Sequence, residues 1–591
     1  MKNIIVLFFT LAFLNGFAQS DYFWVGGTGN WTETTHWATT SGGTDLHNQV
    51  PTSLDNVFFD ANSFDATGQT VTLDNNDLMC NNIDFTGVTN SPTFNGNSKT
   101  LLVYGSIGLV EAMSINATNF QLEATTTGHT LTTAGHTLGN LTFNGIGGEW
   151  TLQDELTSSS TFNLKHGSVI TNSYTLNINN FDSENANVRA LTLGSSIVNL
   201  GTSGQWNVRT TNNFTLNSGT STINLINGRF YQGESNIDNG WHLTYYNVNF
   251  SPTGDNKAQL YTYNGGGRAT YNNLTSTKGL ERWGGGGEVI VMNDFSCSGP
   301  YTGYWGGLID VGGTATFGDS ATFDALFTAN TINFNGVGAT YLLSASNTMT
   351  ANTMNITGGN CGAFTTIRSS SAGSQAILSV TSGTIAVDYV NLKDINATGG
   401  ATFNVNNAID DGNNSGWSIS ALVARDLYWI GNDGNWSDGN NWSLSSGGTP
   451  VGCAPISLDN VFLEGRYPIE LMPALMRKAS ALLVSLTDQP IFGLTVPNKI
   501  QAYLAVGKPV IACLNGEGAR IINEAKAGLS VPAEDSKGLA EAILAMYRMT
   551  DGERSQLGEN GRSYFKEKFD EDVLIDDLIE HFQGVIEKDK I

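Results

Sequence analysis

The amino-acid composition changes abruptly near Gly465, and this change argues against a single fold for all 591 residues. Residues 1–465 contain 13 Lys and Arg against 34 Asp and Glu, and they are rich in Gly, Asn and Thr. Residues 466–591 contain 15 Lys and Arg against 19 Asp and Glu, and they are rich in Ala, Leu, Lys and Glu. A chain of this length exceeds what one hydrophobic core organises, so we expect at least two domains of different fold class.

The N-terminal residues 1–19 have the pattern of a secretory signal peptide. An apolar run extends from Ile4 to Leu14, and Gly16 and Ala18 then offer a small-residue cleavage site. This run is too short to span a bilayer, and no later segment is apolar enough, so we predict no transmembrane helix. The expected localisation is therefore secreted or at the cell surface.

Charge and cysteine usage exclude several other classes of protein. The net charge of -25 would repel nucleic acid and anionic lipid, so we expect no nucleic-acid partner. The five cysteines are far apart, odd in number and never spaced as CxxC, which argues against a disulfide framework or a zinc knuckle. The histidines also lack a metal-binding spacing, so we assign no metal-binding residue.

A tryptophan motif occurs twice, about 405 residues apart in the sequence. The two copies share spacings of seven and six residues and consist of Trp24, Trp31 and Trp37, and of Trp429, Trp436 and Trp442. Each is followed by a Gly-rich stretch and then by PTSLDNVFFD from Pro51 or PISLDNVFLE from Pro455. We predict one small β module at residues 20–65 and a second, truncated copy at 421–464.

Residues 66–420 alternate apolar and small polar side chains with a period of two, as in FTLNSGTSTINL from Phe214. Gly, Asn and Asp interrupt these runs as turn residues, and stretches of helical periodicity are essentially absent. Many short strands of this kind fit a β-solenoid or a series of β-sandwiches. We favour the solenoid, because stacked turns bury each other's faces and suit ladders of Asn and Thr.

The same motifs resemble those of known surface proteins. WVGGTGNW from Trp24, SLDNVFFDANSF from Ser53 and NATGGATFNVNNAIDDGNNSGW from Asn396 resemble large adhesin-like repeat proteins of the surface of Bacteroidetes bacteria. The resemblance covers most of residues 20–464. It implies a structural or adhesive role, with a surface polysaccharide or another cell surface as partner.

Three other functions remain open for this part of the chain. Some polysaccharide-cleaving enzymes are β-solenoids, so a pair of carboxylates on one face can hide in such a sequence. The acidic turn Asp410–Asn414 can ligate calcium, although an ordinary solvated turn explains it more simply. The tryptophans can stack on sugar rings, although their matched spacing favours a packed structural module.

Beyond Arg466 the pattern changes to alternating apolar strands and helices. Strands are expected at 481–486, 509–512 and 529–531, with helices between and after them, which predicts a parallel sheet covered by helices. Thr550 and Glu553 predict a capping box, and Gly561 predicts the end of the helix that it starts. A last amphipathic helix is expected at 573–586. The fold class of the whole chain is therefore a chimera, all-β followed by a truncated α/β Rossmann-like half domain.

This C-terminal segment resembles the donor-binding domain of family 4 glycosyltransferases, which have the GT-B fold of two Rossmann-like domains. The resemblance covers residues 465–591 and rests on PNKIQAYLAVGKP from Pro497 and on GEGA from Gly516. It implies a nucleotide-sugar donor and no other cofactor. By this resemblance, the loop 492–499 would face the nucleotide diphosphate and the turn 516–519 would place a helix N-terminus near the phosphates or the sugar. The implied donor-binding residues are Phe492, Gly493, Pro497, Asn498, Lys499, Gly516, Glu517, Gly518 and Ala519.

The segment departs from the family in ways that bear on activity. Ala502 stands where many relatives carry a ribose-binding Glu, and the acceptor domain and the first part of the donor domain have no counterpart in residues 1–464. The sequence SLDNVF runs directly into LEGRYP. The repeat protein and the transferase are therefore each interrupted within a secondary-structure element, as in a recombination or sequence-assembly chimera. We assign no catalytic residue. We expect an exported adhesin-like protein fused to an inactive transferase fragment; the alternatives are a glycosyltransferase of surface-polysaccharide synthesis and a carbohydrate-binding or polysaccharide-cleaving β-helix.

Overall fold

In the computed structural model, the chain forms two compact units, residues 1–456 and 457–591. The structure describes residues 19–233, 240–254, 257–262, 266–422, 426–430, 438–450, 452 and 468–588. The signal peptide predicted at 1–19 and Trp436 of the second tryptophan motif therefore lie outside the described residues, apart from Gln19. Among the described helices, none is long and apolar enough to cross a membrane.

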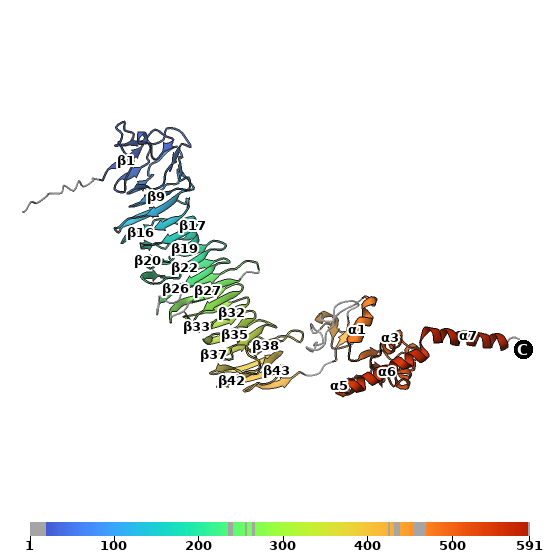
Figure 1. The fold of residues 1–591 in the computed structure, drawn as a ribbon. Helices are drawn as coiled ribbons and strands as arrows, with labels where there is room; N and C mark the ends of the chain where they lie inside the picture. The colour runs from blue at the N-terminus through green and yellow to red at the C-terminus, as the bar shows by residue number, and fades with distance from the viewer. Residues whose placement is uncertain are drawn as a thin grey trace, which may run out of the picture. The chain divides into compact units, whose positions relative to one another are not determined.

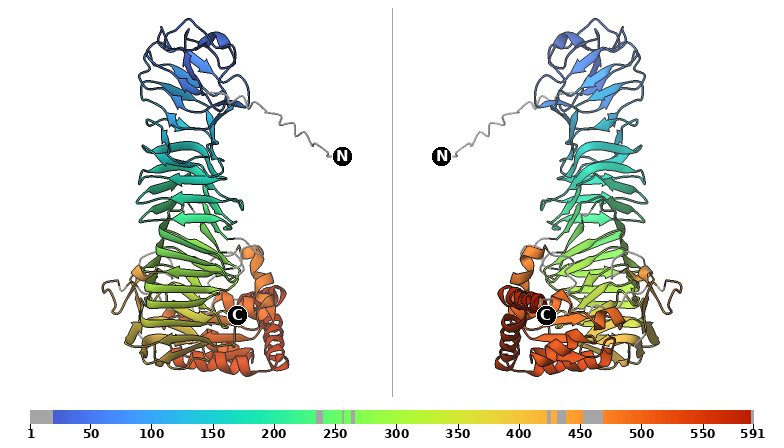
Figure 2. Two further views of the ribbon diagram at one scale, coloured as in Figure 1. Left: turned by 90° about the vertical axis from the view of Figure 1, so that its left-hand side faces the viewer. Right: turned by 90° about the vertical axis from the view of Figure 1, so that its right-hand side faces the viewer.

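The first unit is a stack of parallel β turns in chain order, coloured from blue at the top to yellow at the bottom in Figures 1 and 2. This stack is the β-solenoid expected from the sequence. Val57 pairs with Ile83, Ile83 with Ile107, and Ile107 with Leu131, so the turns at this end contain 24 or 26 residues. Such in-register parallel pairing lets each turn satisfy the backbone N–H and C=O groups of the next.

Near the N-terminus the solenoid has three faces, which become less regular further along. The first face contains β1 (Asp21–Trp24), β3 (Trp37–Ala38), β4 (Asn56–Phe58), β7 (Ile83–Asp84), β10 (Ile107–Gly108), β13 (His129–Thr132), β16 (Glu149–Leu152), β18 (Gly167–Ile170), β20 (Arg189–Thr192) and β23 (Phe214–Asn217). The second contains β2 (Gly29–Asn30), β5 (Thr70–Thr72), β8 (Thr93–Asn95) and β11 (Ser114–Asn116).

The remaining strands form one continuous set of ladders along the solenoid. Up to residue 262 they are β6 (Leu78–Cys80), β9 (Thr100–Val103), β12 (Asn119–Leu122), β14 (Thr137–Leu138), β15 (Leu141–Phe143), β17 (Leu156–Leu164), β19 (Leu176–Asp182), β21 (Ile197–Leu200), β22 (Gln205–Val208), β24 (Thr222–Leu225), β25 (Arg229–Gln232), β26 (His242–Phe250) and β27 (Ala258–Thr262). Beyond it they are β28 (Arg268–Ser276), β29 (Leu280–Gly284), β30 (Glu288–Val291), β31 (Phe295–Cys297), β32 (Tyr301–Tyr304), β33 (Leu308–Phe317), β34 (Ala321–Thr322), β35 (Leu326–Phe334), β36 (Thr340–Leu343), β37 (Thr348–Ile356), β38 (Thr365–Ser369), β39 (Ala376–Val380), β40 (Thr384–Asp388), β41 (Val390–Lys393), β42 (Ile395–Gly399), β43 (Thr402–Asp410) and β44 (Ser418–Ala421).

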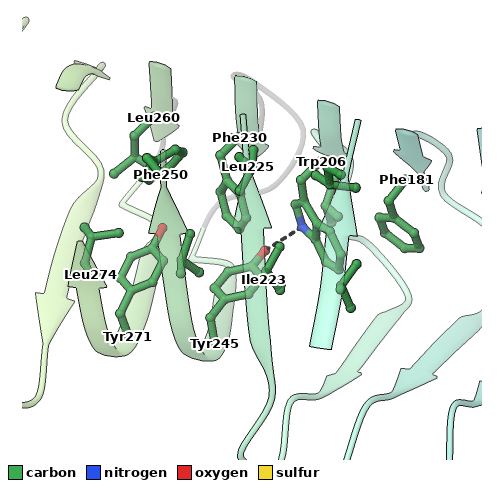
Figure 3. Close-up of a cluster of buried hydrophobic side chains, with 14 of the residues drawn as sticks. Phe181, Trp206, Ile223, Leu225, Phe230, Tyr245, Phe250, Leu260, Tyr271 and Leu274 are labelled. Atoms are coloured by element: carbon green, nitrogen blue, oxygen red, sulfur yellow. Dashed lines mark hydrogen bonds between the residues drawn. The ribbon is translucent and has the colours of Figure 1, made fainter. Parts of the chain in front are cut away.

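Aromatic side chains stack from turn to turn inside the solenoid. The Phe181 and Trp206 rings lie 4.2 Å apart between centroids, and the Trp206 and Phe230 rings 5.8 Å apart (Figure 3). The Trp206 indole donates a hydrogen bond of 3.3 Å to the Tyr245 hydroxyl, which satisfies both groups in a dry interior. Full burial of each such ring contributes about 1.5–3 kcal/mol.

Asparagine side chains form hydrogen-bonded ladders along the solenoid, as expected from the sequence. The Asn199 amide donates to Asn177 (2.8 Å), Asn224 donates to Asn199 (2.9 Å), and Asn249 donates to Asn224 (3.0 Å). The Thr275 hydroxyl donates to Asn249 at 2.7 Å and continues the ladder. The period-two alternation thus places Ile223 in the core and Asn224 in the ladder.

Two buried arginines lie in the solenoid. Arg189 is 1% exposed, and its guanidinium donates to the carbonyl oxygens of Asn187, Asn212 and Thr210 and to Ser183. Arg282 is also 1% exposed, and burial lowers the pKa of its guanidinium. Backbone carbonyls satisfy donors of the Arg189 guanidinium, as a buried guanidinium requires.

The second tryptophan motif lies in the first unit and contains β45 (Tyr428–Trp429) and β46 (Trp442–Ser443), with the 3₁₀ helix η2 (Gly439–Asn441) between them. The corresponding 3₁₀ helix of the first motif is η1 (Thr34–His36). Of the cysteines, Cys361 is disulfide-bonded, whereas Cys80, Cys297 and Cys513 are free and buried.

The second unit is the truncated α/β half domain expected from the sequence. Its parallel sheet has the order β47 (Leu482–Ser485), β48 (Val510–Cys513), β49 (Gly528–Val531). Its helices are η3 (Ile469–Leu471), α1 (Met472–Lys478), α2 (Pro490–Gly493), α3 (Asn498–Val506), α4 (Glu517–Glu524), α5 (Ser536–Arg548), α6 (Asp551–Lys568) and α7 (Glu571–Lys588).

The prediction that Gly561 ends helix α6 is wrong, although the capping box of Thr550 and Glu553 is present. The helix continues to Lys568, and Gly558 and Gly561 are buried within it. A Cβ on Gly558 would lie 2.2 Å from the Gly507 carbonyl oxygen, and one on Gly561 would lie 3.0 Å from Leu504. These glycines therefore serve the close approach of α6 to α3.

Helix α7 carries the exposed apolar stripe expected at 573–586. Its large apolar side chains are each between 45% and 56% exposed: Leu574, Ile575, Leu578, Ile579, Phe582, Val585 and Ile586. A stripe of this kind normally faces a core.

Candidate functional site

The donor-binding residues implied by the sequence lie on two connections that leave the carboxyl edge of the β47–β48–β49 sheet and in the first turns of the helices that follow, α3 and α4. The loop 486–497 follows β47 and leads into α3, and the turn 514–516 follows β48 and leads into α4. Ligands of open parallel sheets bind outside this edge, where helix N-termini point toward the ligand.

The structure brings the two loops together through their glycines. Gly516 has a φ of 74° and lies against the backbone of Gly493, where a Cβ on Gly516 would be 2.0 Å from the Gly493 carbonyl oxygen. Gly518 is buried against α3, where an added Cβ would lie 2.9 Å from Ile500 and 3.5 Å from Pro497. Gly516 therefore cannot be replaced by a larger residue without displacing the backbone at Gly493.

Helices α3 and α4 both begin without a side-chain cap. Their N-cap residues are Pro497 and Gly516, neither of which has a side chain that accepts a hydrogen bond from the first turn. By contrast, Asp535 caps α5 and Thr550 caps α6. The first N–H groups of α3 and α4 therefore remain available to an anion, and the helix dipoles favour one.

The two charged residues of the implied site differ in their surroundings. Lys499 is exposed in the first turn of α3, and within the described residues it has no ion-pair partner. Glu517 is paired with Arg520, whose guanidinium nitrogen lies 2.9 Å from its carboxylate and which also contacts Glu524. The hydrogen bond that the Arg520 guanidinium donates to the Glu517 carboxylate raises the pKa of Arg520.

The remaining implied residues contribute backbone or apolar surface. Phe492 is partly buried at the end of α2, Asn498 is exposed at the start of α3, and Ala519 is partly buried in the first turn of α4. Ala502 is exposed on α3 and has no carboxylate to offer a ribose, as its sequence position implies.

Sequence reasoning missed a polar network that ties together the three loops at the carboxyl edge. The Asn515 amide donates to Asp488 (2.8 Å) and accepts from the Ala533 N–H (3.1 Å), and the Asp488 N–H donates to Glu534 (3.2 Å). Nothing in the spacing of these residues marks them, because Asp488, Asn515 and the adjacent pair Ala533 and Glu534 come from three different loops. Arg520 was missed for a similar reason, since its partner is visible only once Glu517 lies on the same helix.

A shallow hollow of about 330 Å³ opens beside this network. It is lined by Ser485, Leu486, Thr487, Cys513, Glu534, Ser536 and Leu539. None of the donor-binding residues implied by the sequence lines this hollow. The two uncapped helix N-termini therefore define the candidate anion site, and the hollow is a separate feature of the same edge.

In the solenoid, the first tryptophan motif and the acidic turn Asp410–Asn414 have structural roles in packing and in hydrogen bonding within the turn. Trp24, Trp31 and Trp37 are 0% exposed, so their rings are not available to a sugar. In the acidic turn, Asp410 accepts hydrogen bonds from the Gly412 N–H (3.0 Å) and from the Asn414 amide (2.7 Å). Within the described residues, no group of three or more His, Cys, Asp and Glu side chains is arranged to hold a metal ion.

Comparison with known families gives one match. Residues 447–549 match the model of a family described as glycosyl transferases group 1, which covers sheet strands β47–β49 and both loops of the candidate site. No curated protein and no solved structure matches the chain. The chain therefore combines a β-solenoid with a C-terminal segment that is similar to group 1 glycosyltransferases over residues 447–549.

Proposed function

We propose that the chain acts as an exported, adhesin-like structural protein of the cell surface and that its transferase fragment is inactive. The observation that supports the structural role is the asparagine ladder from Asn177 to Asn249, because it commits outward polar side chains to one another. Such ladders stiffen a stack of turns in which a single turn cannot bury its own apolar face without its neighbours.

Export is supported by two features of the first unit. The sequence of residues 1–19 has the signal-peptide pattern, and Cys361 is disulfide-bonded, a linkage that persists in oxidising compartments. The test is to express the tagged chain in its host and to treat intact cells with protease. Loss of the solenoid signal without cell lysis is expected, whereas protection of the intact chain in the cytosol would argue for the transferase alternative.

Inactivity of the fragment is supported by what the candidate site contains. Two uncapped helix N-termini suit a phosphate, but the acid Glu517 is held by Arg520 and the ribose position is Ala502. A transferase of this class reacts in a cleft between two domains, and lost positioning costs up to about 7–11 kcal/mol in favourable cases. Loss of a single stabilising donor costs on the order of a hundredfold in rate.

The test is an assay of the purified chain with uridine and guanosine diphosphate sugars, in both transfer and simple donor hydrolysis. We expect no turnover above background. Turnover that Lys499→Ala or Glu517→Ala abolishes, while the exposed control Lys537→Ala retains it, would contradict inactivity and establish the glycosyltransferase alternative.

A second candidate function, carbohydrate binding, is favoured by an outward aromatic row on the solenoid. Tyr261 and Trp283 stack at 6.0 Å, Trp283 and Tyr304 stack at 4.4 Å, and the Trp305 ring stands at 71° to Trp283. The stacked rings cover each other's faces, but Trp305 is 61% exposed at a φ of 64°, and the Asp324 carboxylate accepts a hydrogen bond from its backbone N–H. An exposed indole beside a carboxylate can hold a sugar ring by stacking and hydrogen bonding.

This candidate is tested by titrating the chain with soluble surface polysaccharide and with simple oligosaccharides. Binding should be lost in Trp305→Ala and retained in Ile146→Ala, which removes an exposed apolar side chain (71% against 61% for Trp305) from a distant turn. Equal binding by both variants would exclude the aromatic row as the site.

A further inference from the structure

The guanidinium of Arg282 is buried in the solenoid with donors that the chain leaves unpaired. Arg282 occupies an inward position of β29 and is 1% exposed. Its Nη1 atom donates to the Gly306 carbonyl oxygen, and its Nη2 atom donates to the Gly287 carbonyl oxygen at 2.8 Å. Its Nε atom has no hydrogen-bond partner, and among the described residues no carboxylate forms an ion pair with Arg282. The positive charge of Arg282 is therefore buried without a counter-ion from the described part of the chain.

The register of the turns places a hydroxyl on each side of this guanidinium. Thr262 of the preceding turn pairs with Gly284, and a Cβ on Gly284 would lie 2.6 Å from the Arg282 Cζ atom. Gly303 of the following turn pairs with Arg282, and a Cβ on Gly303 would lie 3.2 Å from the Tyr301 hydroxyl oxygen. The Arg282 guanidinium thus lies between Thr262 and Tyr301 along the axis of the solenoid.

Both of these hydroxyls are buried and unpaired. Thr262 is 0% exposed and Tyr301 is 2% exposed, and neither hydroxyl oxygen has a hydrogen-bond partner in the part of the chain that the structure describes. Burial raises the pKa of Tyr301, so its phenol keeps the proton and can donate it in a hydrogen bond. Buried polar groups are almost always paired, so unpaired donors on three neighbouring residues indicate a ligand that accepts hydrogen bonds.

Gln232 is the next polar side chain in the same inward column, because it pairs with Thr262 from the turn before. It is 0% exposed, its Nε2 atom donates to the Tyr271 hydroxyl, and its Oε1 atom has no partner within the described ranges. If the carboxamide is reversed, the Tyr271 hydroxyl donates to Oε1 and the Nε2 group becomes the free donor. The polar groups around Arg282 can therefore all donate, which suits an anion better than a water molecule that also needs acceptors.

Glycine backbone covers the Arg282 guanidinium. A Cβ on Gly307 would lie 2.6 Å from the Gly287 carbonyl oxygen and 2.7 Å from the Arg282 Nη2 atom, so two turns close over the guanidinium only because no side chain intervenes. Neighbouring strands lie about 4.8 Å apart, which admits a single-atom ion between inward side chains but no tetrahedral oxyanion or organic acid. An ion can reach this position through local opening of the glycine-rich corner.

We propose that Arg282, Tyr301 and Thr262 form a buried site for one monovalent halide ion, with chloride as the natural ligand. The ion accepts hydrogen bonds from the Arg282 Nε atom and from the two hydroxyls, neutralises the guanidinium and links three successive turns. This site is independent of the surface role proposed above, because it lies in the interior of the solenoid. An ordered water molecule at the same place is the rival explanation.

The first experiment locates the ion directly. The full chain is crystallised in sodium bromide, and data are collected at the bromine absorption edge. We expect an anomalous peak in contact with the Arg282 Nε atom and the Tyr301 hydroxyl. Density without anomalous signal at this position identifies a water molecule and overturns the proposal, and so does a map whose bromide peaks all lie on the protein surface.

The second experiment measures the effect of the ion in solution. Urea denaturation of the full chain is followed by circular dichroism while sodium chloride replaces sodium gluconate at constant ionic strength. Chloride should raise the urea midpoint of the parent, because a ligand of the folded state stabilises it in proportion to its concentration above the dissociation constant. Tyr301→Phe removes one donor and should weaken the apparent chloride affinity about tenfold or more.

Tyr341→Phe is the matched control for this substitution. Tyr341 is 0% exposed, and its hydroxyl is bonded to the Gly336 N–H and the Phe317 carbonyl oxygen, away from Arg282. This variant should keep the chloride response of the parent, whereas Arg282→Met should abolish it. If Arg282→Met does not fold, the comparison of the two phenylalanine variants decides. A parent that does not respond to chloride, or equal responses of Tyr301→Phe and Tyr341→Phe, would overturn the proposal.

Discussion

Gly516 lies against the backbone of Gly493, and a Cβ atom on Gly516 would stand 2.0 Å from the Gly493 carbonyl oxygen. Gly516 also has a φ of 74°, a conformation that side chains other than glycine adopt only with strain. This contact fixes the distance between the two loops that carry the candidate anion site.

The first prediction compares substitutions of the two glycines, because an added Cβ atom meets close neighbours at Gly516 but not at Gly493. Gly516→Ala should lower the free energy of unfolding of the second unit by about 2–4 kcal/mol, because it adds a backbone clash to an unfavourable φ. Gly493→Ala is the matched control, since a Cβ there meets no atom within 4 Å. Chemical denaturation followed by far-ultraviolet circular dichroism measures both, and equal effects would contradict the structural account.

The second prediction concerns the asparagine ladder. Asn224→Ala removes a bond donated to Asn199 and a bond accepted from Asn249, and should destabilise the solenoid by about 1–3 kcal/mol. The control Asn76→Ala, in an exposed turn, should change stability by less than about 0.5 kcal/mol. Urea denaturation compares the two variants.

The third prediction concerns the buried guanidinium of Arg189. Arg189→Met should destabilise the solenoid by about 3–5 kcal/mol, because the buried guanidinium is lost and the partly buried carbonyls of Asn187, Asn212 and Thr210 lose their donors. Arg268→Met is the matched control, since its ion pair with Glu288 is partly exposed and worth about 0–1 kcal/mol. A thermal melt that places both variants at the same midpoint would refute the role of Arg189.

The fourth prediction concerns the pH dependence of stability. Burial raises the pKa of the Cys297 thiol from 9.0 to about 12, because the thiolate is poorly solvated there. Between these values the unfolded chain loses the proton and the folded chain keeps it, so the contribution of the thiol to stability falls as pH rises. The stability difference between the parent and Cys297→Ala should therefore shrink from pH 8 to pH 11.

Urea denaturation at each pH provides the measurement, with Phe295→Leu as control. Phe295 is 2% exposed on the same strand, β31, and has no titrating group, so its stability difference should not depend on pH. A constant difference for Cys297→Ala over this range would show that the thiol ionises equally in both states.

The fifth prediction concerns the apolar stripe of α7. Leu578→Gln and Phe582→Gln should change the free energy of unfolding by less than about 0.5 kcal/mol, because both side chains are about half exposed. Leu504→Ala, in the core between α3 and α6, should cost about 2–5 kcal/mol. The glutamine variants should also bind less of a hydrophobic dye, and a large loss of stability in them would contradict the observed exposure.

The sequence predicts the solenoid because alternation with period two assigns each residue to the core or to the surface. Ile223 and Asn224 fall on opposite sides in the structure for this reason. It does not predict which asparagines meet, because the turn length varies: Trp150 pairs with Val169, whereas Val57 pairs with Ile83. The turn lengths determine which asparagines pair with one another, and loops of variable length set the turn lengths.

The candidate site was predicted by motif and resemblance, and the structure adds the contacts that motifs do not encode. Proximity of Gly493 to Gly516 depends on how α3 and α4 pack, and the Asn515 network joins loops far apart in sequence. Arg189 was missed because a lone arginine in a polar sequence resembles a solvated one. Gly561 was misinterpreted because a glycine that ends a helix and one that permits a close helix contact look alike.

The in-register parallel pairing of successive turns has a mechanical consequence. A force that pulls the two ends of the solenoid apart loads the hydrogen bonds of one interface at a time, so the array should extend by peeling single turns. Ile83 and Ile107 occupy equivalent places in successive turns, and one released turn of 24 residues adds about 80 Å of contour length. The force–extension curve of such a rod is then a regular sawtooth whose period reports the local turn length.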